Sequence, residues 1–168
     1  SFQPNMVWVK SRSQSGSSHG IEDSVRSDGS GSHPMSYTNT DDIETVGGSY
    51  FDVGGGSTPF LTDGFRVNNN DSGNKNTETF VGWSWKESAS AGFDIVSYTG
   101  DGTTDRELPH GLGVAPEFYI IKSRSEAHDW NCWHSGVASG QYGALNSGNA
   151  FASDSGGFMH GAPTSSVL

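Results

Sequence analysis

Cysteine, basic residues and long apolar runs are all scarce in this sequence. The 168 residues include one cysteine, Cys132, so no disulfide can form within the chain. Only 9 residues are Lys or Arg against 19 Asp or Glu, which gives a formal net charge of −10. Binding to a nucleic-acid backbone requires clustered basic side chains, so we expect no nucleic-acid partner. No segment approaches the roughly 20 apolar residues of a membrane-spanning helix, so we expect no membrane insertion.

Helical periodicity is also missing, because no window of useful length repeats its apolar positions every three or four residues and 24 glycines interrupt the chain. A short helical turn around Ile21–Arg26 is the one exception that we expect. The sequence instead contains 9 Phe, 5 Trp and 5 Tyr, placed in short alternating runs. Such runs, separated by Gly, Ser and Asn, are typical of strands and turns. We predict strands over these ranges: Met6–Lys10, Gly64–Val67, Thr77–Trp85, Phe93–Tyr98, Glu117–Lys122 and Asp129–His134.

An internal repeat runs through the chain. PNMVWVKSRS, residues 4–13, returns as PEFYIIKSRS, residues 116–125, an offset of 112 positions. Each copy is apolar on both faces of the expected strand, which is typical of a central strand covered on both sides. The basic residues that close each copy, such as Lys10 and Arg12, are expected to be solvated strand ends or partners of acidic side chains. The repeat therefore indicates packing rather than a binding site.

The repeat also predicts the domain organisation. The segment AGFDIVSYTGDGTTDRELPHGLGVAP leads into the second copy, whereas only SFQ precedes the first. Conversely, the first copy is followed by FLTDGFRV and ETFVGWSWK, whereas the second ends at APTSSVL. We predict two repeats, residues 1–91 without an N-terminal strand and residues 92–168 without C-terminal strands, within a longer polypeptide. The fold class is all-β, with β-sandwich or jelly-roll-like repeats and long Gly/Ser/Asn-rich loops.

Several segments together resemble an uncharacterised repeat module of marine tailed bacteriophages. They are FQPNMVWVKSRS, DSVR, FLTDGFRV, ETFVGWSWK, GFDIVSYTGDGT, HGLGVAPEFYIIKSRS, DWNCWH and APTSSV. Such modules occur in tandem in tail-fibre and other virion proteins and are thought to adopt concanavalin-A-like sandwiches. The acidic insertion NTDDIETVGGSYFDVGGGS departs from the module.

The resemblance implies a structural protein of the virion, the extracellular phage particle, as a tail-fibre or capsid-fibre segment in host attachment or particle architecture. No catalytic residue is carried over, and we expect no enzymatic activity. The expected partners are copies of the same chain in a homo-oligomer, other virion proteins and a host-surface glycan. The alternative function is a carbohydrate-active domain, either lectin-like or glycan-hydrolysing. Hydrolysis needs two carboxylates about 5–10 Å apart across a cleft.

Aromatic residues are the candidate glycan-binding residues. Trp133, Tyr142 and Trp130 are the side chains that we expect to stack on sugar rings. Trp83 and Trp85 alternate along a strand and therefore share one face. Exposed, they would form a platform for sugar rings; buried, they would fill the core between sheets, which is the interpretation that their size favours.

Oxygen-rich loops provide candidate metal ligands. Asp101 and Asp105 in TGDGTTDRE have the hard oxygen ligands that calcium prefers, although turn chemistry explains the same residues. We expect no cofactor, with calcium as the alternative. In HDWNCWH, His128 and His134 lie at opposite ends of a strand, roughly 20 Å apart, too far to share one zinc ion.

Two further motifs are weak. GSSHG, residues 16–20, matches the G-x-S-x-G nucleophile elbow, but polar residues separate it from the preceding strand and no long helix is expected after it. Asp41, Asp42 and Glu44 are expected to form a solvated loop. Neither motif changes the expected function.

Overall fold

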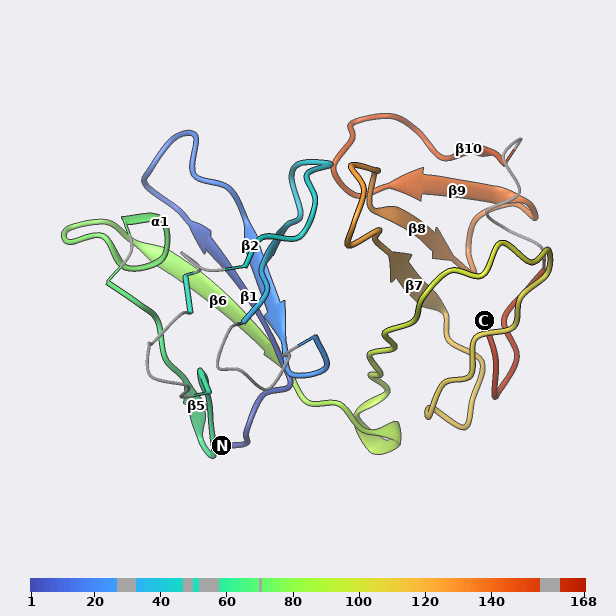
Figure 1. The fold of residues 1–168 in the computed structure, drawn as a ribbon, viewed down its shortest axis with the longest axis horizontal. Coiled ribbons are helices and arrows are strands. Elements are labelled where there is room, and N and C mark those ends of the chain that lie inside the picture. The colour runs from blue at the N-terminus through green and yellow to red at the C-terminus, as the bar shows by residue number, and fades with distance from the viewer. Residues whose placement is uncertain (27–32, 47–49, 52–57, 70, 155–160) are drawn as a thin grey trace.

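The chain folds into two four-stranded antiparallel sheets and a small two-stranded one (Figure 1). The predicted all-β fold is confirmed, and no helix among the described residues is long and apolar enough to cross a membrane. The computed structural model describes the following residues: 1–26, 33–46, 50–51, 58–69, 71–154 and 161–168.

The first sheet has the strand order β3-β2-β1-β6. β1 is central, as its two apolar faces predict. Along β1, Trp8 lies opposite Ile21 on one side and opposite Trp83 on the other. The bounds of the four strands are β1 Met6–Ser11, β2 Gly20–Asp23, β3 Ser36–Tyr37 and β6 Phe80–Trp85.

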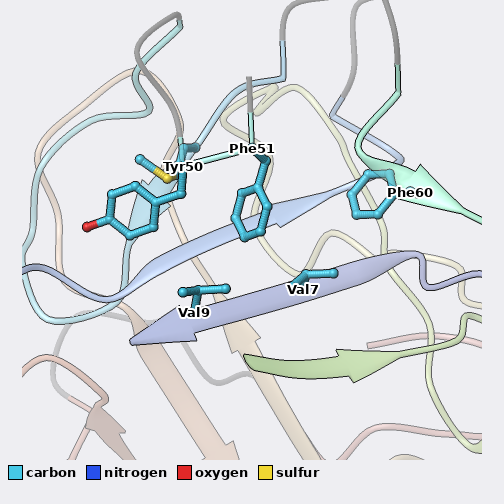
Figure 2. Close-up of a cluster of buried hydrophobic side chains, with 6 residues drawn as sticks. Val7, Val9, Tyr50, Phe51 and Phe60 are labelled. Atoms are coloured by element: carbon cyan, nitrogen blue, oxygen red, sulfur yellow. The ribbon is translucent and has the colours of Figure 1, made fainter. Parts of the chain in front are cut away.

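One face of β1 lies on the main hydrophobic core. Val7 and Val9 are buried, whereas Trp8 between them is half-buried, because successive side chains of a strand point to opposite faces. Tyr50, Phe51 and Phe60 pack over the two valines, as Figure 2 shows. The short elements of this region are β4 Phe60–Leu61, β5 Gly64–Phe65 and α1 Asp71–Asn74.

The second sheet has the order β10-β9-β8-β7, so β7 is an edge strand among the described residues, and the expectation of a central strand is wrong for the second copy of the repeat. Its strands are β7 Phe118–Ile121, β8 Asn131–His134, β9 Gln141–Ala144 and β10 Ala152–Ser153. The 3-10 turn η1, Ala89–Ala91, precedes the segment that leads to this sheet, and Ser88 caps it.

Two local predictions are wrong. The segment Phe93–Tyr98 is not a strand: Phe93 makes an isolated bridge to Ser88, and residues 94–98 have no regular structure. The expected helical turn at Ile21–Arg26 is strand β2 followed by a bend. In both places the pairing partner decides the conformation, and local alternation does not reveal that partner.

A buried charge network joins the two sheets. The carboxylate of Glu44 accepts hydrogen bonds from Arg26 Nη1 at 3.0 Å and from Arg124 Nη2 at 2.8 Å. Arg26 also pairs with Asp23, and the Glu44 side chain is only 8% exposed. Glu44 was expected in a solvated loop, and that expectation is wrong because two guanidinium groups compensate its burial. Trp130 adds a second link, since its Nε1–H donates to the carbonyl of Tyr37 at 2.9 Å.

Gly20→Ala is expected to lower the free energy of unfolding by about 2 kcal/mol, the range for overpacking a core. A Cβ at Gly20 would lie 2.7 Å from two ring carbons of Tyr50 and 2.8 Å from the sulfur of Met35. The matched control is Gly64→Ala, because a Cβ there meets nothing within 4 Å. Chemical denaturation measures both variants, and equal midpoints would contradict the packing described here.

Candidate functional site

A cleft of about 360 Å³ lies where the first sheet meets the turn that follows β9. One wall comes from β1 and from the residues that flank β2 and β3. The other wall comes from residues 145–147, in the turn that follows β9. A volume of this size is at the small end of ligand sites, which are usually about 300–1,000 Å³. The lining residues are Trp8, His19, Thr38, Asn39, Leu145, Asn146 and Ser147.

A tryptophan cluster adjoins this cleft. The β1–β6 register places Trp8 beside Trp83, with ring centroids 5.6 Å apart, and Trp85 lies 6.5 Å from Trp8. Trp83 is 43% exposed, whereas Trp85 is half-buried and stacks on Phe93. The favoured expectation that both tryptophans fill the core is therefore wrong for Trp83. Its ring remains available on the sheet face that also carries Trp8.

Polar groups in the cleft are held in place by their neighbours. Lys10 Nζ lies 2.5 Å from His19 Nε2, so Nε2 accepts this hydrogen bond and the imidazole is neutral. Burial and the positive charge of Lys10 both lower the pKa of His19. The backbone N–H of His19 donates to the side-chain oxygen of Asn39 at 2.7 Å. Asn146 accepts from the backbone of Trp130 and donates to Asp129. Fixed amides of this kind orient hydroxyl groups of a ligand.

The predicted glycan-binding residues lie outside the cleft. Trp130 is 7% exposed, and its indole N–H is used by Tyr37. Trp133 is 9% exposed and stacks on Tyr119, with centroids 5.4 Å apart. Tyr142 is half-buried in β9, opposite Ala152 of β10. The indoles of Trp130 and Trp133 are covered by protein, so neither offers an open ring face for stacking on a sugar.

The predicted metal ligands have internal partners. The Asp101 carboxylate accepts hydrogen bonds from the hydroxyl and the backbone N–H of Thr103, which hold its pKa below the usual value, and it pairs with Arg106 at 3.3 Å. Asp105 adopts a left-handed backbone conformation with φ 54°. In the part of the chain that the structure describes, no three His, Cys, Asp or Glu side chains gather as a metal site. Turn chemistry accounts for the geometry of this loop.

The GSSHG motif does not assemble a nucleophile with a base. Nε2 of His19, the atom that would act as the base, accepts its hydrogen bond from Lys10. His19 instead contributes to the wall of the cleft.

Sequence reasoning missed Trp8, Asn39 and the turn 145–147 as cleft residues. Trp8 was assigned to a packing strand, and that is half correct, since its neighbours Val7 and Val9 form the core. The one sequence pattern that pointed to this part of the molecule was the alternation of Trp83 and Trp85. Its significance depends on the pairing of β6 with β1, which lies about 70 positions earlier in the chain.

Tyr119 provides a test of the second sheet. Burial, followed by the nearby charge of Asp154, raises the pKa of Tyr119 to about 12 from 10.0. The folded state therefore keeps a proton that the unfolded state loses. The corresponding stability is complete below pH 10 and disappears as the pH rises towards about 12.

Burial also raises the pKa of Tyr50, so spectroscopic titration of tyrosinate is expected to show two late-ionising tyrosines, of which Tyr119→Phe removes one. Tyr98→Phe is the control, because Tyr98 is 41% exposed. Loss of a late ionisation in Tyr98→Phe, or two late ionisations remaining in Tyr119→Phe, would contradict the assignment.

Comparison with known proteins places the chain in a family. One family model, described as "Domain of unknown function (DUF7483)", matches residues 1–168. The chain belongs to this family. No curated protein and no solved structure matches it. The match spans both sheets of the DUF7483 domain but assigns no activity, so a function has to be argued from the cleft.

Proposed function

We propose that this DUF7483 domain is a non-enzymatic glycan-recognition module whose binding site is the cleft beside Trp8 and Trp83. The observation that carries the proposal is Trp83, which is 43% exposed and whose ring lies 5.6 Å from that of Trp8, a residue that lines the cleft together with fixed amides. A flat indole packs against the C–H face of a sugar ring, while amide and hydroxyl groups bind its hydroxyls. Such a combination of apolar rings and neighbouring polar side chains suits a sugar.

The charge of the domain favours a neutral glycan. The net charge of −10 repels acidic sugars, and Lys10 is already engaged with His19 at the cleft. The cleft volume of about 360 Å³ suits one or two sugar rings rather than a long chain. Neutral mono- and disaccharide units are therefore the class of ligand that we propose.

The arrangement of carboxylates favours binding over hydrolysis. No Asp or Glu is among the residues that line the cleft. Glu87 and Asp94 do lie together elsewhere, and burial, followed by the hydrogen bond that the protonated Glu87 carboxyl donates to Asp94, raises the pKa of Glu87. Carboxyl groups in direct contact are closer than the about 5 Å that a retaining glycosidase needs.

The virion role is also a proposal, and its support is the sequence resemblance to phage repeat modules. We propose that the domain is a tail-fibre or capsid-fibre segment in which the cleft contacts host-surface glycans. Its partners would be copies of itself and other virion proteins. Repeated copies would raise the avidity of a weak sugar site without new contacts.

Trp83→Ala is expected to weaken glycan binding at least about tenfold, because central tryptophans dominate binding energy in many interfaces. A printed array of neutral oligosaccharides identifies the ligand, and calorimetry compares the variants. The matched control is Tyr98→Ala, because Tyr98 is 41% exposed but its ring lies under the guanidinium of Arg106, whereas that of Trp83 lies beside Trp8. Thermal unfolding confirms that both variants are folded. Binding to no oligosaccharide, or equal affinity for both variants, would contradict the proposal.

A further inference from the structure

The two large sheets repeat one hydrogen-bonding arrangement. In the first sheet, the N–H of Ser24 donates to the carbonyl of Asn5 at 2.8 Å, beside the β1–β2 pair. In the second sheet, the N–H of Ser135 donates to the carbonyl of Glu117 at 2.8 Å, beside the β7–β8 pair. Residue 117 follows residue 5 by the 112 positions of the sequence repeat. β7 is therefore the counterpart of β1 in register as well as in sequence.

The correspondence continues across the rest of both sheets. Ser36 of β3 pairs with Ile21 of β2. In the same way, Gly143 of β9 pairs with Cys132 of β8. The bridge from Met35 to Thr45 in the first sheet matches the pair Tyr142–Ala152 in the second. All three residues of the first sheet precede their counterparts by 107 positions. Each strand of the second sheet thus has a counterpart in the first, whereas β6 has none among the described residues.

The missing position lies along the free edge of β7 (Figure 1). Within β1, even-numbered N–H groups face β6, and Arg12 beyond the strand end continues this pattern with its N–H on the carbonyl of Thr79. Before the strand begins, the N–H of Asn5 also donates to β6, at the carbonyl of Trp85. In an antiparallel ladder, alternate residues face opposite neighbours. Glu117 faces β8, so the N–H groups of Phe118 and Ile120 face away from β8. The counterparts of these two residues in β1 are Met6 and Trp8, which face β6.

Side chains at this edge are exposed as well. Phe118 is 49% exposed and Ile120 is 37% exposed, whereas Trp8 is half-buried because Trp83 and Trp85 of β6 lie against it. One end of the edge is occupied, since the N–H of Glu44 donates to the carbonyl of Arg124 at 3.1 Å. Lys122 Nζ donates to the carbonyl of Asp41 at 3.1 Å, so the open stretch among the described residues is 118–121.

We propose that the free edge of β7 is a docking site for an extended strand of another polypeptide segment with the β6 pattern. That pattern is aromatic side chains at alternate positions, as in FVGWSWK, residues 80–86. The incoming strand pairs antiparallel with β7, and its aromatic side chains cover Phe118 and Ile120. Backbone pairing supplies affinity, and the alternate aromatic residues supply specificity, as in other cases of β-strand addition. This site is separate from the glycan cleft.

A synthetic peptide of residues 80–86 tests the proposal on the intact chain. We expect hydrogen exchange at the amides of Phe118 and Ile120 to slow at least tenfold when the peptide is added. Exchange at Tyr119 should change little, because that amide already faces β8. Unchanged exchange at Phe118 and Ile120 at saturating peptide would overturn the proposal.

Two N-methylated peptides provide matched controls. By the β1–β6 register, the N–H of Trp83 faces the partner strand and that of Ser84 faces away. Methylation of the Trp83 nitrogen should therefore raise the dissociation constant at least tenfold, while methylation of the Ser84 nitrogen should leave it within twofold. Equal effects of the two methyl groups would overturn the predicted pairing.

A variant of the chain separates peptide docking from self-association. Ile120→Pro removes one donor from the free edge, a position where edge strands tolerate proline, and should abolish peptide binding. In sedimentation without peptide, the unmodified chain and Ile120→Pro are expected to show the same association state. Association that Ile120→Pro abolishes would show that a second copy occupies the edge, and it would overturn the proposed occupant.

Discussion

Glu44→Gln is expected to lower the free energy of unfolding by about 3 kcal/mol, the usual cost of breaking a buried ion pair. The substitution leaves the shape of the side chain but removes the charge that faces Arg26 and Arg124. Arg26 is only 11% exposed on its side chain, so water replaces little of the lost charge. Because Asp23 still pairs with Arg26, the expected loss is at the low end of the range of about 3–5 kcal/mol. For a domain of this size the loss corresponds to a decrease of about 10 °C in the melting temperature.

Glu126→Gln is the matched control, because Glu126 pairs with His128 at the surface with 74% of its side chain exposed. Exposed pairs of this kind contribute at most about 1 kcal/mol. Chemical denaturation of both variants gives the comparison. Similar small losses in both would show that the Glu44 network does not hold the two sheets together.

Phe51→Ala is expected to cost about 4 kcal/mol, because removal of a buried aromatic ring leaves a cavity in the core. Phe51 is fully buried, and Figure 2 shows it beside Tyr50 above the two valines. Its ring centroid lies 6.4 Å from that of Tyr50 and 6.1 Å from that of Phe65. The loss should appear in chemical denaturation as a lower midpoint with an unchanged slope.

Phe2→Ala is the control for this substitution, since Phe2 is 42% exposed. A surface change of this kind usually alters stability by less than about 0.5 kcal/mol. If Phe51→Ala were no more costly than Phe2→Ala, the core would have to lie elsewhere than over Val7 and Val9.

The sequence predicted the strands whose own pattern is strong. β1, β6, β7 and β8 lie within the predicted ranges or extend them by one residue, because aromatic and β-branched residues alternate there. β2, β9 and β10 were not predicted, since they are short and their conformation follows from pairing with a neighbour. Gly20 in β2 illustrates this point, because its lack of a side chain serves the close approach of Tyr50.

The candidate site was only partly predictable. The idea that strand aromatics bind sugars requires knowing which rings remain exposed, and exposure depends on contacts that are distant in sequence. Trp130 is covered through Tyr37, 93 positions away, and Trp83 stays exposed beside Trp8. Composition and alternation are alike for both tryptophans. By exposure and position, Trp8 and Trp83 are therefore better candidates for the proposed role than Trp130 and Trp133.

The role of the repeated segment also became clearer. PNMVWVKSRS was expected to be a packing strand, and Val7 and Val9 confirm this for one face. The other face carries Trp8, which lines the cleft. In the second copy, the same strand is at a sheet edge, and its Arg124 binds Glu44 of the acidic insertion. One sequence pattern thus serves a core, a cleft and a link between sheets.

Nuclear magnetic resonance of the indole N–H groups tests the glycan site most directly. The 5 tryptophans give five indole signals, which single substitutions assign. When the neutral oligosaccharide selected by the array is added, the signals of Trp8 and Trp83 should shift and saturate together, while those of Trp130 and Trp133 should stay unchanged. Shifts confined to Trp130 and Trp133, or no shift at any tryptophan, would contradict the proposed recognition site.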